Sequence, residues 1–323
     1  MLTTLAAPAF AKTWYIEDGD ITVKASDTGN DVTQKDKTTY GDKDTIITNR
    51  KEDASSNTVT IEAEKKDDKV EVTLKDVNID TSSRNKAAVS VTGEGDINIK
   101  LNGDNALKSD IYRSGIYGSG SGSLTISGGE NDSLTAQGGS GANGISSSGS
   151  LTISGGSTVT ANGGSGTISG GDGICSSGGV TISGGSTVTA NGGNGGSLVG
   201  GDGIRSGGGL TVSDGTVTAK GGNGDSKDGY GGDGIRSGGV VTISGNTVNA
   251  AGGYGGKVGG YGISSFDRVA ISGGTVNATG GDSTGSDGGG GDGISSSGID
   301  LSGSLELTAK AGSPNGKALS QKG

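Results

Sequence analysis

The sequence predicts an all-β protein folded as a single-stranded right-handed parallel β-helix, with about nine coils of 28–31 residues and an N-terminal cap. Three observations predict this fold. One isoleucine recurs at a spacing of 28 to 31 residues, each repeat holds short alternating segments, and glycines separate these segments. The recurring isoleucines are Ile116, Ile145, Ile174, Ile204, Ile235, Ile263 and Ile294. A fixed period of this length is typical of a solenoid, in which each repeat stacks on the one before.

Each repeat is expected to form three short strands. In the repeat 170–190, which reads GGDGICSSGGVTISGGSTVTA, they cover 173–176, 180–183 and 187–190. These segments are too short for ordinary helices, and the surrounding glycines disfavour helix. Crossovers between parallel strands are right-handed by strong preference, which predicts the hand of the solenoid. Small residues expected at an inner corner are Ala161, Ala190, Ala219, Ala250 and Ala278.

The composition also favours a solenoid over a compact globule. Of 323 residues 72 are glycine, and hydrophobic residues make up only 28%, too few for a compact core of this size. The alternative is a disordered chain rich in glycine and serine. The regular alternation of valine, isoleucine and threonine argues against disorder.

Charge and residue usage exclude several classes of function. The net charge of −10 argues against a nucleic-acid partner, which requires a basic face. The chain has no histidine, and therefore lacks the commonest general base and transition-metal ligand. Cys175 is the only cysteine, so no intrachain disulfide is expected. No apolar run approaches the ~20 residues of a membrane-spanning helix, and we expect a monomer.

The chain divides into four segments. Residues 1–11 resemble the remnant of a secretory signal peptide, because Ala9-Phe10-Ala11 fits the cleavage rule; a frayed cytoplasmic terminus is the alternative. Residues 12–57 are expected to form the cap, 58–311 the parallel β-helix and 312–323 a polar tail. A secreted, extracellular protein, associated with the cell surface or free, is the predicted localisation.

Four blocks of sequence carry a family resemblance. They are VEVTLKDVNI, INIKLNGDNAL, SGIYGSGSGSLTISGG and the SGGSTVTANGG units, and they occur in this order within 58–311. Together they resemble the glycine-rich β-helix domains of secreted Gram-positive surface proteins. They are more loosely similar to clostridial β-helix proteins described as carbohydrate-binding. The resemblance implies an extracellular interaction with a glycan or a surface, and it transfers no catalytic residue.

A row of acidic residues is a candidate calcium site. The same place in four repeats holds Asp172, Asp202, Asp233 and Asp292. Asn143 and Tyr261 fill this place in two other repeats. Stacked carboxylates repel one another unless a cation or hydrogen bonds compensate them, and calcium takes several oxygen ligands. The alternative is that each aspartate caps its own turn.

Six side chains are candidates for carbohydrate binding. They are Tyr230, Tyr254, Tyr261, Phe266, Arg205 and Arg236. Aromatic rings on a shallow face stack on sugars, whereas loop packing is the structural alternative for them. The two arginines follow aspartates by three residues and are also explained by pairing with them. Polysaccharide lyases of this fold combine calcium carboxylates with an arginine base, which keeps a pectate-lyase-like enzyme as an alternative.

Pairs of threonines recur in another part of the repeat. The array consists of Thr158/Thr160, Thr187/Thr189 and Thr216/Thr218, continued by Thr247/Asn249 and Thr275/Asn277. Such a grid resembles that of ice-binding β-helices. Threonine is also simply a good residue for an exposed strand.

These observations favour a carbohydrate-binding, adhesin-like module that contacts polysaccharide or a cell-surface glycan along the side of the solenoid. They favour binding over catalysis, because each charged candidate lies at a position dictated by the repeat. A purely structural surface stalk, a calcium-dependent polysaccharide lyase and an ice-binding protein are the alternatives.

Overall fold

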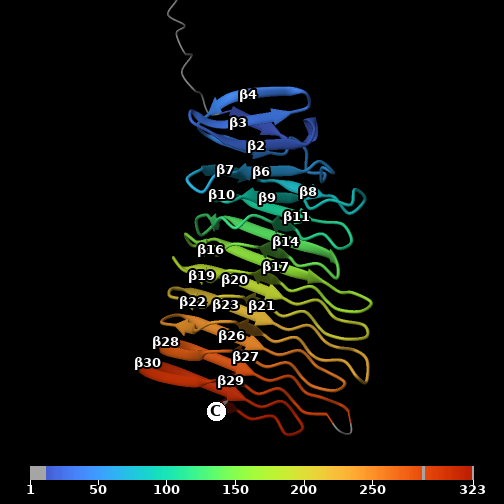
Figure 1. Cartoon of the computed structure of the whole chain (residues 1–323), viewed down its shortest axis with the longest axis vertical. Helices are drawn as coiled ribbons and strands as arrows, with labels where there is room; N and C mark the ends of the chain where they lie inside the picture. Colours follow the sequence, from blue (N-terminus) through green and yellow to red (C-terminus); the bar gives the residue numbers. More distant parts are fainter. Residues whose placement is uncertain (1–11, 286–287, 322–323) are drawn as a thin grey trace, which may run out of the picture.

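The computed structural model, which describes residues 12–285 and 288–321, is a parallel β-solenoid of about 11 turns (Figure 1). Its described part contains strands and one three-residue 3-10 helix, η1 (Ile16–Asp18). The predicted all-β solenoid is therefore confirmed. The signal-like segment 1–11 lies outside the described residues. Among the described residues, no helix has the length and apolar character needed to cross a membrane.

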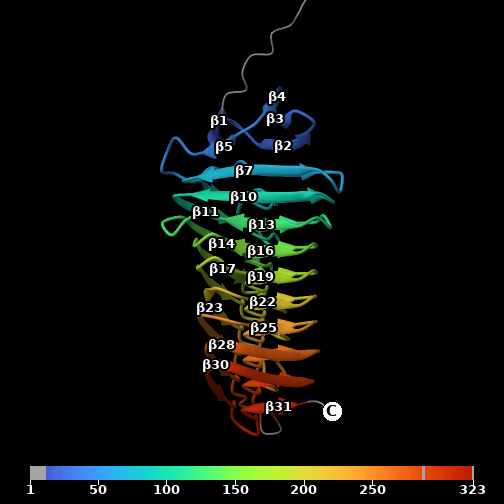
Figure 2. The same cartoon turned by 90° about the vertical axis from the view of Figure 1, so that its left-hand side faces the viewer.

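Three columns of strands run along the rod (Figures 1 and 2). The first column belongs to a 13-stranded sheet and consists of β2 (Ile21–Ser26), β6 (Val59–Ala63), β9 (Val89–Gly93), β12 (Ile116–Gly118), β15 (Ile145–Ser147), β18 (Ile174–Ser176), β21 (Ile204–Ser206), β24 (Ile235–Ser237), β27 (Ile263–Ser265), β29 (Ile294–Ser296) and β31 (Leu319–Gln321). All are paired in parallel. The strands from β12 to β29 carry the recurring isoleucine, and Val59, Val89 and Leu319 take its place in β6, β9 and β31.

The other two columns share an 18-stranded sheet. The second column consists of β1 (Lys12–Tyr15), β5 (Thr45–Thr48), β7 (Lys69–Lys75), β10 (Asp96–Asn102), β13 (Leu124–Ser127), β16 (Leu151–Ser154), β19 (Val180–Ile182), β22 (Leu210–Val212) and β25 (Val241–Ile243). The third consists of β8 (Asn78–Asp80), β11 (Asp104–Lys108), β14 (Ser133–Ser140), β17 (Thr158–Gly164), β20 (Ser186–Asn191), β23 (Gly215–Lys220) and β26 (Thr247–Ala251). The long strands β28 (Arg268–Thr279) and β30 (Gly298–Lys310) continue both columns.

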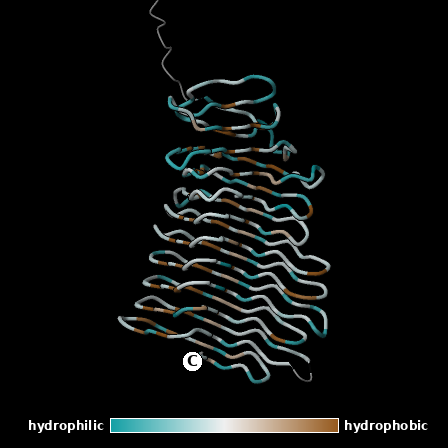
Figure 3. The backbone as a smooth tube through the Cα atoms, viewed as in Figure 1, coloured by the Kyte–Doolittle hydropathy of each residue, from teal (hydrophilic) through white to brown (hydrophobic). Residues whose placement is uncertain are grey.

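The core is built by stacking like residues on like. Ile174 pairs with Ile204, and Val188 pairs with Val217 one turn further on. These side chains are fully buried, as are the alanines predicted at the inner corner. Apolar residues consequently recur at corresponding places in successive turns (Figure 3). Each strand contributes only a few inward side chains to the core, so a sequence with few apolar residues can still form a continuous core along the rod.

The solenoid extends beyond its predicted bounds, and the expectation of about nine coils was too low. Within the predicted cap, β2 pairs in parallel with β6, through Ile21 and Val59. Within the predicted polar tail, β31 pairs with β29, through Ile294 and Leu319. Parallel pairing uses backbone groups and needs only an apolar residue at the inward position. Turns without the glycine-rich motif therefore stack as well.

The cap consists of strands that run antiparallel to their neighbours, unlike the parallel strands of the solenoid. β3 (Gly29–Gln34) pairs antiparallel with β2, and β4 (Lys37–Asp42) pairs antiparallel with β3. Trp14 is buried beneath this sheet end, and its indole Nε1 donates a hydrogen bond to Asp42 Oδ2 at 2.9 Å. The antiparallel strands cover the N-terminal end of the core, as solenoid ends require.

The loops between the third and the first column are ordered by two facing columns of glycine. The first column is Gly171, Gly201, Gly232, Gly260 and Gly291; the second is Gly164, Gly193, Gly222, Gly253, Gly281 and Gly312. Backbone hydrogen bonds of 2.8 Å zigzag between them, from Gly222 N–H to Gly201 O and from Gly232 N–H to Gly222 O. A Cβ added at Gly201 would overlap the backbone oxygen of Gly171. These glycines allow the two legs of each loop to approach.

Candidate functional site

The aspartate row forms a hydrogen-bonded ladder between turns. Asp172, Asp202 and Asp233 precede β18, β21 and β24, and all three are buried. Asp172 Oδ1 accepts from the Asp202 backbone N–H at 2.7 Å, and Asp202 Oδ1 accepts from the Asp233 N–H at 2.7 Å. Asp233 Oδ1 accepts from the Tyr261 N–H at 2.8 Å. Each aspartate thus holds the next turn rather than capping its own.

The two ends of the row keep the same pattern. Asn143 Oδ1 accepts from the Asp172 N–H at 2.7 Å, so an amide performs the same task. Asp292 is only half-buried, and its Oδ1 accepts from the Lys317 N–H at 2.8 Å. The ladder therefore needs one side-chain oxygen per turn and does not need a charge.

The two arginines occupy paired positions but have different partners. Arg205 Nε lies 2.8 Å from Asp202 Oδ2 and 3.3 Å from Asp172 Oδ2, and it bridges the two carboxylates. Arg236 is in register with Arg205. The structure gives Arg236 no ion pair with a described carboxylate; its guanidinium lies 5.5 Å from the centre of the Phe266 ring.

Burial in this row disfavours ionisation. Burial, and then the charge of Asp202, raise the pKa of Asp172 to about 6, although Arg205 opposes the shift. The same two causes raise the pKa of Asp233 to about 7, against the hydrogen bond from the Tyr261 backbone. Burial is the main physical origin of both shifts, and repulsion by the neighbouring carboxylate adds to it.

A shallow hollow of about 480 Å³ opens beside this row. Its lining includes the side chains of Tyr230, Tyr261, Phe266, Arg236, Asp202 and Asp233. Phe266 is 66% exposed and Tyr230 is 39% exposed, so both rings are available to a ligand. An adjoining hollow of about 380 Å³ is lined by Arg205, Arg236 and Phe266 among others. Aromatic rings and charged groups thus meet on one surface.

The hollow gathers most of the residues that the sequence singled out, but not all of them. Tyr254 does not line it, and the Tyr254 hydroxyl is hydrogen-bonded to the hydroxyl of Thr284. Asp172 and Asp292 also lie outside its lining. Tyr254 falls in a turn next to those of the other rings, but its hydroxyl contacts Thr284 and its side chain does not line the hollow.

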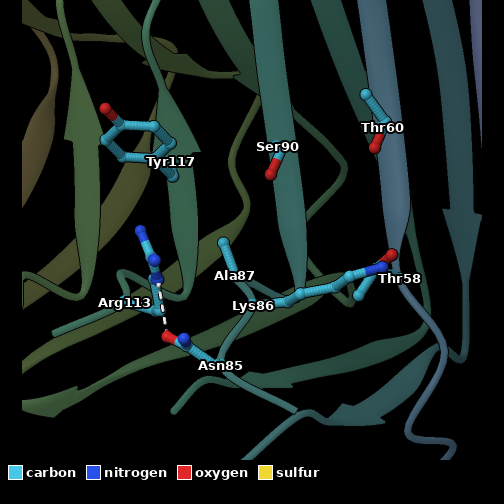
Figure 4. A pocket seen from close by; sticks show the side chains of 8 residues that line it. All are labelled: Thr58, Thr60, Asn85, Lys86, Ala87, Ser90, Arg113 and Tyr117. Carbon is cyan, nitrogen blue, oxygen red and sulfur yellow. Dashed lines mark hydrogen bonds between the residues drawn. The ribbon is translucent and has the colours of Figure 1, made fainter. Parts of the chain in front are cut away.

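A separate hollow, of about 310 Å³, was not predicted (Figure 4). Its lining is Thr58, Thr60, Asn85, Lys86, Ala87, Ser90, Arg113 and Tyr117. Thr60, Ser90 and Tyr117 come from the neighbouring strands β6, β9 and β12. Arg113 Nε donates to Asn85 Oδ1 at 3.2 Å, and Tyr117 is 46% exposed.

Both hollows lie on one line of paired positions in the first column of strands, here called the outward ladder. Its members are Thr60, Ser90, Tyr117, Ser146, Cys175, Arg205, Arg236 and Ser264. A comparison of repeats could have predicted that Tyr117 belongs to this ladder, because Tyr117 follows Ile116 as Arg205 follows Ile204. The ladder carries small residues between Tyr117 and Arg205.

Metal binding stays a prediction from the sequence. In residues 12–285 and 288–321, no group of three or more histidine, cysteine, aspartate or glutamate side chains is placed to hold a metal ion. The Oδ1 atoms of Asp172, Asp202 and Asp233 accept backbone hydrogen bonds, and Arg205 contacts Oδ2 of the first two. Calcium would have to share the carboxylates with these partners.

The threonine array is in register on the third column of strands. Thr158 pairs with Thr187, and Thr187 pairs with Thr216. The asparagines that continue it are hydrogen-bonded to each other, with Asn277 Nδ2 donating to Asn249 Oδ1 at 2.9 Å. These amides therefore have a structural role in joining turns.

Cys175 is expected to be unreactive in the folded protein. Burial, and then the charge of Asp172, raise the pKa of its thiol to about 12, which disfavours the nucleophilic thiolate. A chromogenic disulfide reagent should label Cys175 at least about 100-fold more slowly in buffer than in denaturant. Because Ser146 occupies the paired position, Cys175→Ser should leave the melting temperature unchanged. Rapid labelling of the folded protein would contradict this assignment.

No protein-family model matches the chain, and neither a curated protein nor a solved structure is significantly similar to it. The fold and the hollow define a β-solenoid with an aromatic and charged surface on its side.

Proposed function

We propose that the protein is a secreted or surface-displayed carbohydrate-binding module that contacts polysaccharide along the side of the solenoid. The observation that carries the proposal is the hollow in which Tyr230, Tyr261 and Phe266 lie beside Arg236 and Asp233. Exposed rings stack on the apolar faces of sugars, and charged groups hydrogen-bond to sugar hydroxyls. The hollow is shallow and open, as a site for an internal unit of a long chain must be.

The outward ladder supports an extended ligand. Tyr117 and Arg236 are separated by four pairings along this ladder, or ~19 Å at ~4.8 Å per strand. The small residues Ser146 and Cys175 lie between them. A glycan chain lying parallel to the rod would reach both hollows, and the many turns would then provide the length of the binding surface.

Loss of either exposed ring should weaken glycan binding. A glycan array should identify a ligand, and calorimetry should then show that Phe266→Ala and Tyr230→Ala each weaken it at least about tenfold, equal to about 1.4 kcal/mol. The reason is the lost stacking area. Tyr40→Ala is the matched control, because Tyr40 is 76% exposed and lies in the cap, outside this hollow.

Four outcomes would contradict the proposal. An array without any ligand would favour a structural stalk, and thermal hysteresis on freezing would favour the threonine array. We propose binding without turnover; an ultraviolet-absorbing unsaturated product formed from pectate and calcium, and lost in Arg205→Ala or Arg236→Ala, would show a lyase instead. Binding that survives both ring substitutions would place the site elsewhere on the protein.

A further inference from the structure

Two consecutive turns share the residues Asp-Gly-Ile-Arg but leave their aspartates in different states. In the first, the Arg205 guanidinium closes over Asp202 and Asp172. In the second, Arg236 lies over the Phe266 ring and pairs with no described carboxylate. Within the described residues, Asp233 Oδ2 has neither a hydrogen-bond partner nor an ion-pair partner. Asp233 is thus the aspartate of this pair that is left open.

Asp233 is also the aspartate that a ligand can use. It is 6% exposed, and it lines the hollow of about 480 Å³ together with Tyr230 and Phe266. Because Asp233 lines the hollow, a ligand that enters the hollow can donate hydrogen bonds to this carboxylate, and such bonds are strengthened by its charge. The hollow provides the space for such a ligand.

Asp233 is the feature of this hollow that favours a cationic ligand. Asp233, Asp202 and Arg236 all line the hollow, Asp202 already pairs with Arg205, and Arg236 forms no ion pair with a described carboxylate. Two cationic side chains lie near the exposed rings without covering them: Lys257 Nζ lies 5.5 Å from the centre of the Tyr230 ring, and the Arg236 guanidinium lies 5.5 Å from the centre of the Phe266 ring. Aromatic faces attract cations electrostatically. A group with positive charge and several N–H donors meets both requirements.

We infer that this hollow binds the protonated amine of an amino-sugar unit, with the ammonium on Asp233 Oδ2 and the sugar face on the Phe266 or Tyr230 ring. An ammonium supplies three donors. A neutral N-acetyl group lacks the charge, and a uronate would place a second negative charge beside Asp233. This inference rests on the proposed function and names the class of glycan that the hollow selects.

The test compares three oligosaccharides by calorimetry at about pH 7, where the sugar amine and Asp233, whose pKa is about 7, are both at least partly charged. Glucosamine hexamer should bind at least about tenfold more tightly than N-acetylglucosamine hexamer, and oligogalacturonate without calcium should not bind there. Asp233→Asn should lower the affinity for glucosamine hexamer at least about tenfold. This variant should fold, because Asn143 already makes the same bond between turns.

Asp282→Asn is the matched control. Asp282 Oδ1 also accepts a backbone N–H from the next turn, that of Ser313 at 2.7 Å, but Asp282 lies outside the hollow. Equal affinity for the two hexamers, or full affinity in Asp233→Asn, would overturn the inference while leaving carbohydrate binding standing. If no glycan on the array binds, both the proposed carbohydrate binding and the inferred preference for amino sugars are wrong. If calcium chloride alone instead displaces glucosamine hexamer from the wild type and not from Asp233→Asn, Asp233 binds calcium. That result would overturn the inference of an amine ligand.

Discussion

Gly201→Ala is expected to lower the free energy of unfolding by about 3 kcal/mol, and Gly222→Ala by a similar amount. The added Cβ at Gly201 would overlap the oxygen of Gly171, and the Cβ at Gly222 would overlap the oxygen of Gly193. These neighbours are backbone atoms, which cannot rotate away as a side chain can. The turns would have to separate, and the hydrogen bonds between the glycine columns would lengthen.

Urea denaturation followed by circular dichroism measures this loss. Gly289→Ala is the control, because a Cβ at Gly289 meets nothing within 4 Å. Gly289 also pairs with Val258, and Val258 pairs with Tyr230, so side chains occur naturally at this place in the loop. We expect Gly289→Ala to change the free energy of unfolding by less than about 0.5 kcal/mol. Equal effects of Gly201→Ala and Gly289→Ala would show that the glycine columns are not tightly packed.

The free energy of unfolding is expected to fall as the pH rises from about 4 to about 7. Burial raises the pKa of Asp172 to about 6 and that of Asp233 to about 7, from an ordinary value of 3.8. The folded protein therefore binds these protons more tightly than the unfolded chain. Their stabilisation is present at low pH and is lost as the pH passes each folded pKa. One such group contributes a slope of up to about 1.4 kcal/mol per pH unit.

Urea denaturation at a series of pH values checks the slope. Asp233→Asn should flatten the curve and raise the free energy of unfolding at pH 7, because the amide keeps the bond to Tyr261 without a buried charge. Arg205→Ala should steepen the curve, since its guanidinium opposes the shift at Asp172. Asp282→Asn, at an exposed site, should leave it unchanged. A free energy of unfolding that rises with pH in the wild type and not in Asp233→Asn would contradict the predicted direction.

The candidate site was only partly predictable. The row of aspartates and the rings near it could be read from the repeat, because equal offsets in a solenoid become neighbours in space. That Phe266 and Tyr230 share a hollow while Tyr254 does not depends on side-chain directions in the loops. The hollow around Tyr117 was missed because most of its lining residues, such as Thr60 and Ser90, precede Ile116, the first of the recurring isoleucines.

The sequence by itself determined the stacking of the repeats, the residue that each strand buries and the register between turns. It could do so because the same apolar residues recur at one period, and any slip would turn them outward. Only the tertiary structure decided how the loops close and which aspartate stays open. Arg205 and Arg236 stand in identical motifs, yet Asp202 is already bound by Arg205, and Phe266 from the following turn offers Arg236 a ring instead. Such differences depend on neighbouring turns, so a single repeat does not contain them.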